Sequence, residues 1–175
     1  MLLEDIDFSK IVPSDHGLLR AGIIPYVKRN GDIYFMMGID TKTGEYSDFG
    51  GGVKMYENAL SAAMRECREE SRGLIDFRDL GLIRRGILSR RYRQNVCIMF
   101  SEITIPNFYE NSRNIFHSRK NKYNEMSDIV WISSNNMYKW TQLNCKNSKI
   151  WIRIRYALTI HSDFNRKFIE DLKNL

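Results

Sequence analysis

Three consecutive glycines, Gly50 to Gly52, lead into a segment with a strong helical pattern, and this combination most limits how the chain can fold. Asn58 is a favourable N-cap residue, and residues 59–71 contain neither glycine nor proline. Gly73 can end a helix by taking a left-handed conformation. The sequence therefore predicts a glycine-rich loop that runs directly into a helix.

The predicted helix has three different faces. At roughly 100° per residue, an apolar face holds Leu60, Ala63, Met64 and Cys67. A basic face holds Arg65, Arg68 and Arg72, and an acidic face holds Glu66, Glu69 and Glu70. Like charges at the spacing i, i+3, i+4 destabilise a helix by about 0.2 to 0.5 kcal/mol per pair, so a positive group is expected beside them. Three carboxylates near loop carbonyls such as that of Gly50 form an all-oxygen site suited to Mg²⁺ or Mn²⁺.

The helix alone also allows a second interpretation. A solvated helix can carry glutamates and arginines that simply pair with one another, and Arg65 with Glu69 at i, i+4 is the best example here. The glycine-rich loop in front of the helix favours the metal site over this alternative.

The loop and helix together resemble the Nudix box of the Nudix hydrolases. The matching positions are Gly51, Glu57, the pair Arg65-Glu66 and the pair Glu69-Glu70, at the family's spacing. Six fixed positions at a background of roughly 7 per cent each give a chance on the order of 10⁻⁷ per window. Two positions depart from the pattern. Cys67 stands at an aliphatic position, and Arg72 stands where the closing glycine is expected, so that Gly73 arrives one residue late.

The resemblance implies a fold, a chemistry and a set of site residues. The implied fold is α/β, a Nudix-type α/β/α sandwich with a mixed β-sheet. Its metal ligands would be Glu66, Glu69 and Glu70 with the Gly50 carbonyl, binding Mg²⁺ or Mn²⁺. Glu66, or a carboxylate outside the box, would take the proton of the attacking water. Glu57 and Arg65 would form an ion pair that holds the loop against the helix.

An additional acid from a later loop is often used in this family. Glu125 is the candidate for this extra ligand or base, and Asp128 is the second choice. An ordinary loop carboxylate is the alternative for either residue.

Length and composition indicate one globular domain over residues 1–175. Residues 1–16 are expected to form an N-terminal arm, and residues 148–175 the C-terminal helices. The chain has no apolar run of membrane-spanning length and no signal peptide at its acidic start, so a cytoplasmic location is expected. The three cysteines are widely spaced and suggest neither disulfides nor a zinc site.

Between these segments the pattern predicts several further elements. Residues 17–28 and 33–39 form a hairpin around the Asn30-Gly31 turn, with Pro25 suggesting an edge or a bulge. Strands are predicted within 75–85, 95–103 and 128–132, and helices over 134–140, 148–161 and 163–175. Residues 106–124 lose periodicity and are predicted to form a long loop beside the substrate cleft.

The net charge of +6 and a pI near 9.3 favour polyanionic partners: a nucleotide, an inositol polyphosphate or capped RNA. Arg20, Arg84 and Arg91 could contact phosphates, and Phe49 could stack on a base, as could Tyr123. A solvated surface position is the alternative for each arginine, and a packing role for each aromatic residue.

Two functions of different classes follow. The first is Mg²⁺- or Mn²⁺-dependent hydrolysis of a phosphoanhydride bond in capped mRNA, a dinucleoside polyphosphate or a diphosphoinositol polyphosphate. The second is a non-catalytic module that binds RNA or a nucleotide on the same fold. The intact cluster of Glu66, Glu69 and Glu70 favours the enzyme, because a binding module has no need of clustered like charges.

Overall fold

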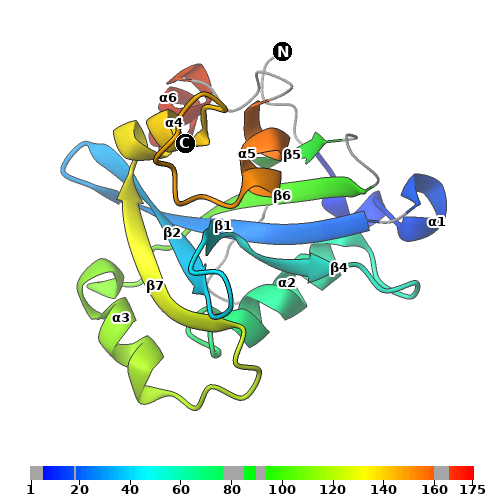
Figure 1. Cartoon of the computed structure of the whole chain (residues 1–175), viewed down its shortest axis with the longest axis horizontal. Coiled ribbons are helices and arrows are strands. Elements are labelled where there is room, and N and C mark those ends of the chain that lie inside the picture. Colours follow the sequence, from blue (N-terminus) through cyan, green and yellow to red (C-terminus); the bar gives the residue numbers. More distant parts are fainter. Residues whose placement is uncertain (1–5, 18, 77–84, 90–93, 160–165) are drawn as a thin grey trace.

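A central sheet with helices on both faces forms the framework of the molecule (Figure 1). The computed structural model describes residues 6–17, 19–76, 85–89, 94–159 and 166–175. The strands are β1 (Leu19–Arg29), β2 (Asp32–Asp40), β3 (Tyr46–Ser47), β4 (Phe49–Gly52), β5 (Arg85–Ser89), β6 (Asn95–Glu102) and β7 (Met126–Ser133). The helices are η1 (Phe8–Lys10), α1 (Pro13–His16), α2 (Ala59–Glu70), α3 (Phe108–Ser118), α4 (Ser134–Thr141), α5 (Ile152–Thr159) and α6 (Arg166–Asn174).

Among the described residues the sheet has seven strands and is mixed. Its main order is β3-β2-β1-β6-β5, while β4 pairs with β1 and β7 pairs with β2. The long strands β1 and β6 run parallel, and the other pairs are antiparallel. This arrangement confirms the mixed sheet predicted from the sequence.

Strand β1 lies at the centre of the sheet, so the prediction that Pro25 marks an edge or a bulge is wrong. On one side β1 pairs with β4 over residues 20–23 and with β2 over residues 26–29. Pro25 falls between these two pairings, where a residue without a backbone N–H donor is tolerated.

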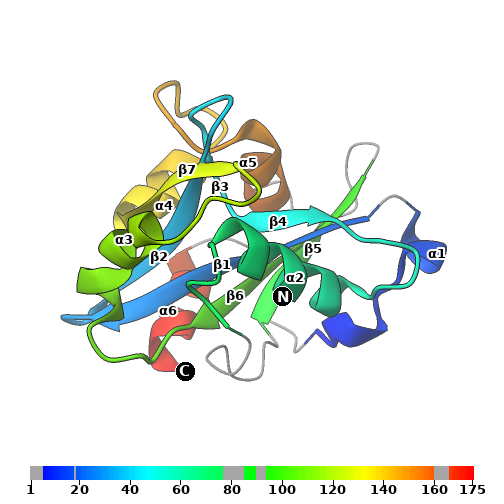
Figure 2. The ribbon, with the colours of Figure 1, turned by 90° about the horizontal axis from the view of Figure 1, so that it is seen from below.

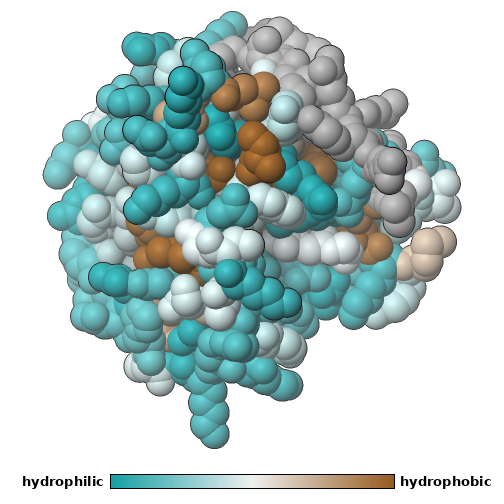
Figure 3. All heavy atoms as spheres, viewed as in Figure 1, coloured by the Kyte–Doolittle hydropathy of each residue, from teal (hydrophilic) through white to brown (hydrophobic). Residues whose placement is uncertain are grey.

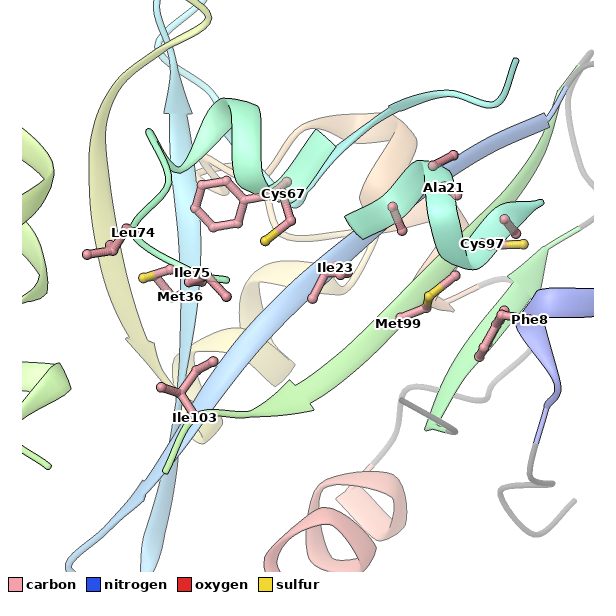
Figure 4. Close-up of a cluster of buried hydrophobic side chains, with 14 of the residues drawn as sticks. Phe8, Ala21, Ile23, Met36, Cys67, Leu74, Ile75, Cys97, Met99 and Ile103 are labelled. Carbon is pink, nitrogen blue, oxygen red and sulfur yellow. The ribbon is translucent and has the colours of Figure 1, made fainter. Parts of the chain in front are cut away.

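The two faces of the sheet carry separate hydrophobic cores, because successive side chains of a strand point to opposite faces. Ile23 packs towards η1, α2 and α3, whereas the next residue, Ile24, packs towards α4, α5 and α6. Figure 2 shows α2 and α6 on opposite sides of the sheet. Figure 4 shows the first core, where Cys67 of α2 lies above Met99 and Ile23. The α/β/α sandwich expected from the resemblance is therefore present.

Most of the predicted elements are found, and one is wrong. The hairpin, the strands over 95–103 and 128–132 and the helices near 134–140 and 163–175 are confirmed, and the helix predicted from 148 begins at Ile152. Residues 106–124, predicted as a long loop, contain helix α3. Most of the strand predicted within 75–85 lies outside the described residues. In the N-terminal arm, Phe8 is buried in the first core.

The face of the molecule that is drawn in Figure 3 is largely hydrophilic. Figure 3 shows polar side chains over most of the face seen in Figure 1, with small apolar patches between them. No helix within the described part of the chain is long and apolar enough to cross a membrane.

Candidate functional site

Helix α2 begins at the predicted N-cap and ends just before Arg72. The Asn58 side chain accepts a hydrogen bond from the Ser61 backbone N–H (2.8 Å), and the Ser61 hydroxyl accepts one from the Asn58 N–H (3.2 Å). This reciprocal pair is a capping box. At the other end, Arg72 and Gly73 both have positive φ, and the Gly73 N–H donates to the Arg68 carbonyl at 2.7 Å. Two residues with positive φ, Arg72 and Gly73, therefore follow the end of the helix, whereas the sequence predicted only Gly73.

Small side chains form the face that α2 buries against the sheet. The buried residues are Ala59, Ala62, Ala63, Cys67 and Glu70, whereas Leu60 and Met64 are only partly buried. The buried face is therefore rotated relative to the predicted apolar stripe. Because alanines allow the helix to approach the sheet closely, Glu70 enters the buried side of the site.

Three carboxylates meet at this point: Glu66, Glu70 and Glu125 each offer an oxygen, and these oxygens lie within 4.8 Å of one another. Glu70 is only 8% exposed, and the Glu66 side chain is 13% exposed. Glu125 is exposed and comes from the connection between α3 and β7. The cluster thus has a buried floor on α2 and an exposed acid at its mouth.

Two glycines of β4 make the close contact between loop and helix possible. The Gly50 N–H donates to Glu70 Oε2 at 2.7 Å. A Cβ added at Gly51 would lie 2.5 Å from the carboxyl carbon of Glu66, which no side chain could accept without displacing that carboxylate. The Gly50 carbonyl, predicted as a metal ligand, accepts a hydrogen bond from Arg20 at 3.0 Å.

The ion pair predicted between Glu57 and Arg65 is present. Arg65 Nε donates to Glu57 Oε1 (2.7 Å), and Nη2 donates to Glu57 Oε2 (3.0 Å) and to the Gly52 carbonyl (3.2 Å). Arg65 Nη1 also lies 2.5 Å from Glu66 Oε1 and 3.5 Å from Glu69 Oε2. Arg65 therefore ties the loop to the helix. Glu69 lies beside Arg65 and is not one of the three carboxylates that converge.

Burial and crowding raise the pKa of both carboxylates on the floor of the site. Burial raises the pKa of Glu66, and Glu69 and Glu125 add to this effect against the opposing charge of Arg65. Burial and the nearby Asp48 raise the pKa of Glu70 to about 9, although Arg20 and the Gly50 N–H act in the opposite direction. Such shifts mark carboxylates whose negative charge is not fully balanced by the protein.

The sequence prediction missed Asp48, which is completely buried next to this site. Arg20 donates to both of its carboxylate oxygens, at 2.8 Å and 2.7 Å. Arg20 is itself only 6% exposed. Its predicted role as a phosphate ligand is therefore corrected to a structural one, because its guanidinium is already occupied by Asp48 and the Gly50 carbonyl.

Of the other predicted substrate contacts, Phe49 is corrected to a core residue, and Arg84 and Arg91 lie outside the part of the chain that the structure describes. Phe49 is fully buried in the first core, because β4 turns it towards that core, and it cannot stack on a base there. Tyr123 is 44% exposed.

Asp128, the second choice for the extra acid, is already occupied. It binds Arg113 Nη2 at 2.5 Å and His117 Nε2 at 2.8 Å, both on α3. Partial burial acts to raise its pKa, but hydrogen bonds from Arg113, the Ile129 N–H and His117 lower that pKa to about 2. Asp128 therefore anchors α3 to β7, while Glu125 faces the other carboxylates.

Arg72, the residue that departs from the Nudix pattern, joins α2 to the segment that carries Glu125. Its guanidinium lies 3.9 Å from the ring centre of Phe116 and donates to the carbonyls of Phe116 (3.3 Å) and Met126 (3.0 Å). In return, Arg119 donates to the carbonyls of Arg72 and Gly73. These contacts hold both ends of the connection between α3 and β7 against the end of α2.

Two hollows flank the carboxylates. The first, of about 260 Å³, includes Glu70, Gly50, Arg20 and Trp151 in its lining and is called the acidic hollow here, because it has one cation and three carboxylates. The second, of about 720 Å³, includes Arg65 and Glu69 and is called the basic hollow, because it has five cations and one carboxylate. The carboxylate cluster therefore lies between an acidic hollow and a basic hollow.

No protein-family model and no curated protein sequence matches the chain. Among solved structures, it is similar to a C. elegans Ap4A hydrolase in a binary complex, with a TM-score of 0.59, 17% identity, and 90% of this chain and 99% of that chain covered. It is also similar to a second structure of a C. elegans Ap4A hydrolase, with a TM-score of 0.53, 17% identity, and coverage of 84% and 97%. The chain therefore shares its overall fold with these two structures.

Proposed function

We propose that this protein is a Mg²⁺- or Mn²⁺-dependent hydrolase of phosphoanhydride bonds. The convergence of Glu66, Glu70 and Glu125 carries the proposal. It joins two residues of the resembling motif to Glu125, an acid about 55 residues away that the same resemblance implies as an extra ligand or base. Support also comes from the fold, which is shared with hydrolases.

The residues present fit a hard divalent cation. All the donors are carboxylate oxygens, which suit Mg²⁺ and Mn²⁺. The raised pKa values of Glu66 and Glu70 show that a positive charge would stabilise this cluster. Glu66, Glu70 and Glu125 would hold the ion, whereas Glu69, a ligand by the resemblance, lies beside Arg65 on the same helix. An ion held there would neutralise phosphoryl oxygens and would make a bound water molecule more acidic.

The protein's own groups would then position the reaction. Arg65, tied to Glu57 and the Gly52 carbonyl, fixes the orientation of Glu66. Glu125 is the exposed carboxylate of the three, so it is the group best placed to accept the proton of an attacking water at its carboxylate oxygen. Arg20 and Asp48 keep β1 and β4 together beneath Glu70.

Turnover of a substrate panel tests this function. The panel contains diadenosine polyphosphates, capped RNA, diphosphoinositol polyphosphates and ADP-ribose, each with Mg²⁺ or Mn²⁺. Diadenosine polyphosphates come first because the fold is shared with an Ap4A hydrolase. Glu66→Gln and Glu69→Gln should abolish or strongly reduce product release. Glu170→Gln, on the exposed surface of α6, is the matched control.

Two results would contradict the proposal. One is equal product release by the wild type and both site variants on every compound. The other is tight binding without turnover by the wild type, which would support a non-catalytic module instead.

A further inference from the structure

The basic hollow is a large, positively charged surface that the proposed chemistry does not use. It lies between α2 and residues 119–123, the start of the connection between α3 and β7. Arg65 lines it and also touches Glu66 at 2.5 Å, and Tyr123 on its rim is two residues from Glu125. The basic hollow is therefore directly adjacent to the candidate metal site.

Three of its five cations have no acidic partner among the described residues, although the Lys122 ammonium lies 5.3 Å from the ring centre of Tyr123. Arg65 is paired with glutamates, and Arg72 donates to two backbone carbonyls. Arg68, Lys120 and Lys122 are exposed and form no ion pair within the described residues. They come from two different elements and line one concave surface. A concave surface lined by unpaired cations attracts polyanions, and a guanidinium with two ammonium groups matches phosphate oxygens.

The two hollows differ in what they can accept. The acidic hollow contains Asp40, Glu45 and Glu70, and its cation, Arg20, is bound to Asp48. Phosphate groups that are not neutralised by a metal ion would be repelled there. In the basic hollow, by contrast, the side chains of the protein can bind the phosphate groups of a substrate without a metal ion.

We propose that Arg68, Lys120 and Lys122 bind phosphate groups of the substrate that lie beyond the bond hydrolysed. This inference rests on the proposed function and narrows it. Substrates with further phosphates next to the scissile anhydride, on a linear chain or on a ring, are preferred over short ones such as ADP-ribose.

Binding in EDTA tests the hollow separately from catalysis. The probes are inorganic tripolyphosphate, as a chain, and inositol hexakisphosphate, as a ring, measured by calorimetry at low salt. The triple variant Arg68→Gln/Lys120→Gln/Lys122→Gln should bind the preferred probe roughly tenfold more weakly than the wild type. The control Lys139→Gln/Lys146→Gln/Lys167→Gln removes the same charge from exposed positions elsewhere. Its affinity for the probe should stay within about twofold of the wild-type affinity. The probe whose affinity falls further identifies the chain or the ring as the source of the phosphates.

The outcomes separate this inference from the proposed function. Equal weakening in both triple variants, or in neither, would overturn the basic hollow as a site, whatever the activity. Loss of binding in the first triple alone supports the hollow even if the wild type hydrolyses no compound. If the wild type is active, the first triple should raise KM for diadenosine tetraphosphate roughly tenfold and leave KM for ADP-ribose unchanged. Similar changes for both substrates would contradict the stated preference.

Discussion

Glu70 is the residue on which the electrostatics of the site concentrate. It is almost fully buried, it accepts one hydrogen bond from the Gly50 N–H, and it lies near both Asp48 and Glu66. Its pKa is about 9 against an ordinary value of 4.5. Without a metal ion, the folded protein therefore holds a proton on Glu70 at neutral pH.

This raised pKa predicts that the metal-free protein loses stability as pH rises. Between about pH 4.5 and 9 the folded state binds a proton at Glu70 that the unfolded chain has released. The stabilisation is complete below pH 4.5 and falls by up to about 1.4 kcal/mol per pH unit above it. Urea unfolding in EDTA at pH 6, 7 and 8 measures this slope. Glu70→Gln should flatten it, and an identical slope in both proteins would rule out the shift.

Glu125 allows a second prediction at this scale. Glu125→Gln should slow turnover by well over tenfold, because it removes a carboxylate that converges with Glu66 and Glu70. Its free energy of unfolding should change by no more than about 0.5 kcal/mol, since the side chain is exposed. The rate at saturating substrate and urea unfolding check the two parts. Glu110→Gln, an exposed acid on α3, should keep the wild-type rate.

The sequence predicted some of these residues and missed others for a definite reason. The Glu57–Arg65 pair, which is present in the structure, and the role proposed for Glu66 were implied by the resemblance to the Nudix box. The Arg20–Asp48 pair joins two positions 28 residues apart, and it exists because β1 and β4 pair in the register Gly22 with Gly50. That register depends on tertiary structure, so Arg20 was interpreted as a phosphate ligand.

At the scale of elements, the contact between α2 and the segment from α3 to β7 decides where Glu125 lies. Arg72 is its main link, because it donates to the carbonyl of Met126, the residue next to Glu125. Its positive φ of 57° is a strained conformation for a residue other than glycine. The polar and aromatic contacts of its side chain offset this strain.

Removing the Arg72 side chain should therefore weaken both the fold and the reaction. Arg72→Ala is expected to lower the free energy of unfolding by about 1 to 3 kcal/mol, because two part-buried hydrogen bonds to carbonyls and the contact with the Phe116 ring are lost. Arg72→Gly should recover part of this loss by relieving the positive φ. Urea unfolding measures both variants. As the control, Arg68→Ala removes an exposed arginine of α2, and its free energy of unfolding should stay within about 0.5 kcal/mol of the wild-type value. If Arg72→Ala has the same free energy of unfolding as the wild type, the contacts of the Arg72 side chain do not stabilise the fold.

Helix α3 shows where a pattern becomes too weak to predict an element. Its buried residues, Phe108, Ser112 and Phe116, follow the spacing i, i+4, i+8, and one of them is polar. Trp131 of β7 stabilises the helix by packing on Phe108 and donating to the Ser112 hydroxyl at 2.9 Å. A stripe this narrow does not stand out in the sequence, because tertiary contacts supply most of the stability of such helices.

At the scale of the molecule, the sequence pattern predicted an α/β arrangement with a mixed sheet, the resemblance implied its three layers, and neither predicted the strand order. The nearly continuous apolar runs of β1 and β6 are typical of strands that are covered on both faces of a sheet. They do not reveal that β1 changes partner from β4 to β2 near Pro25, or that β1 and β6 run parallel. These long-range pairings bring residue 125 next to residues 66 and 70, and only the resemblance to a known family anticipated that approach.

Because the carboxylates come from distant parts of the chain, a metal ion bound by them should stabilise the whole fold. Unfolding separates Glu125 from α2, so the ion binds the folded state alone, and at 100 times its Kd it adds about 2.7 kcal/mol. For a chain of 175 residues this corresponds to a rise in Tm of roughly 5 to 10 °C. Thermal unfolding with increasing Mn²⁺ at pH 7 measures it. Glu66→Gln should lose most of the rise, whereas Glu170→Gln should keep it, and an equal rise in both variants would place the ion elsewhere.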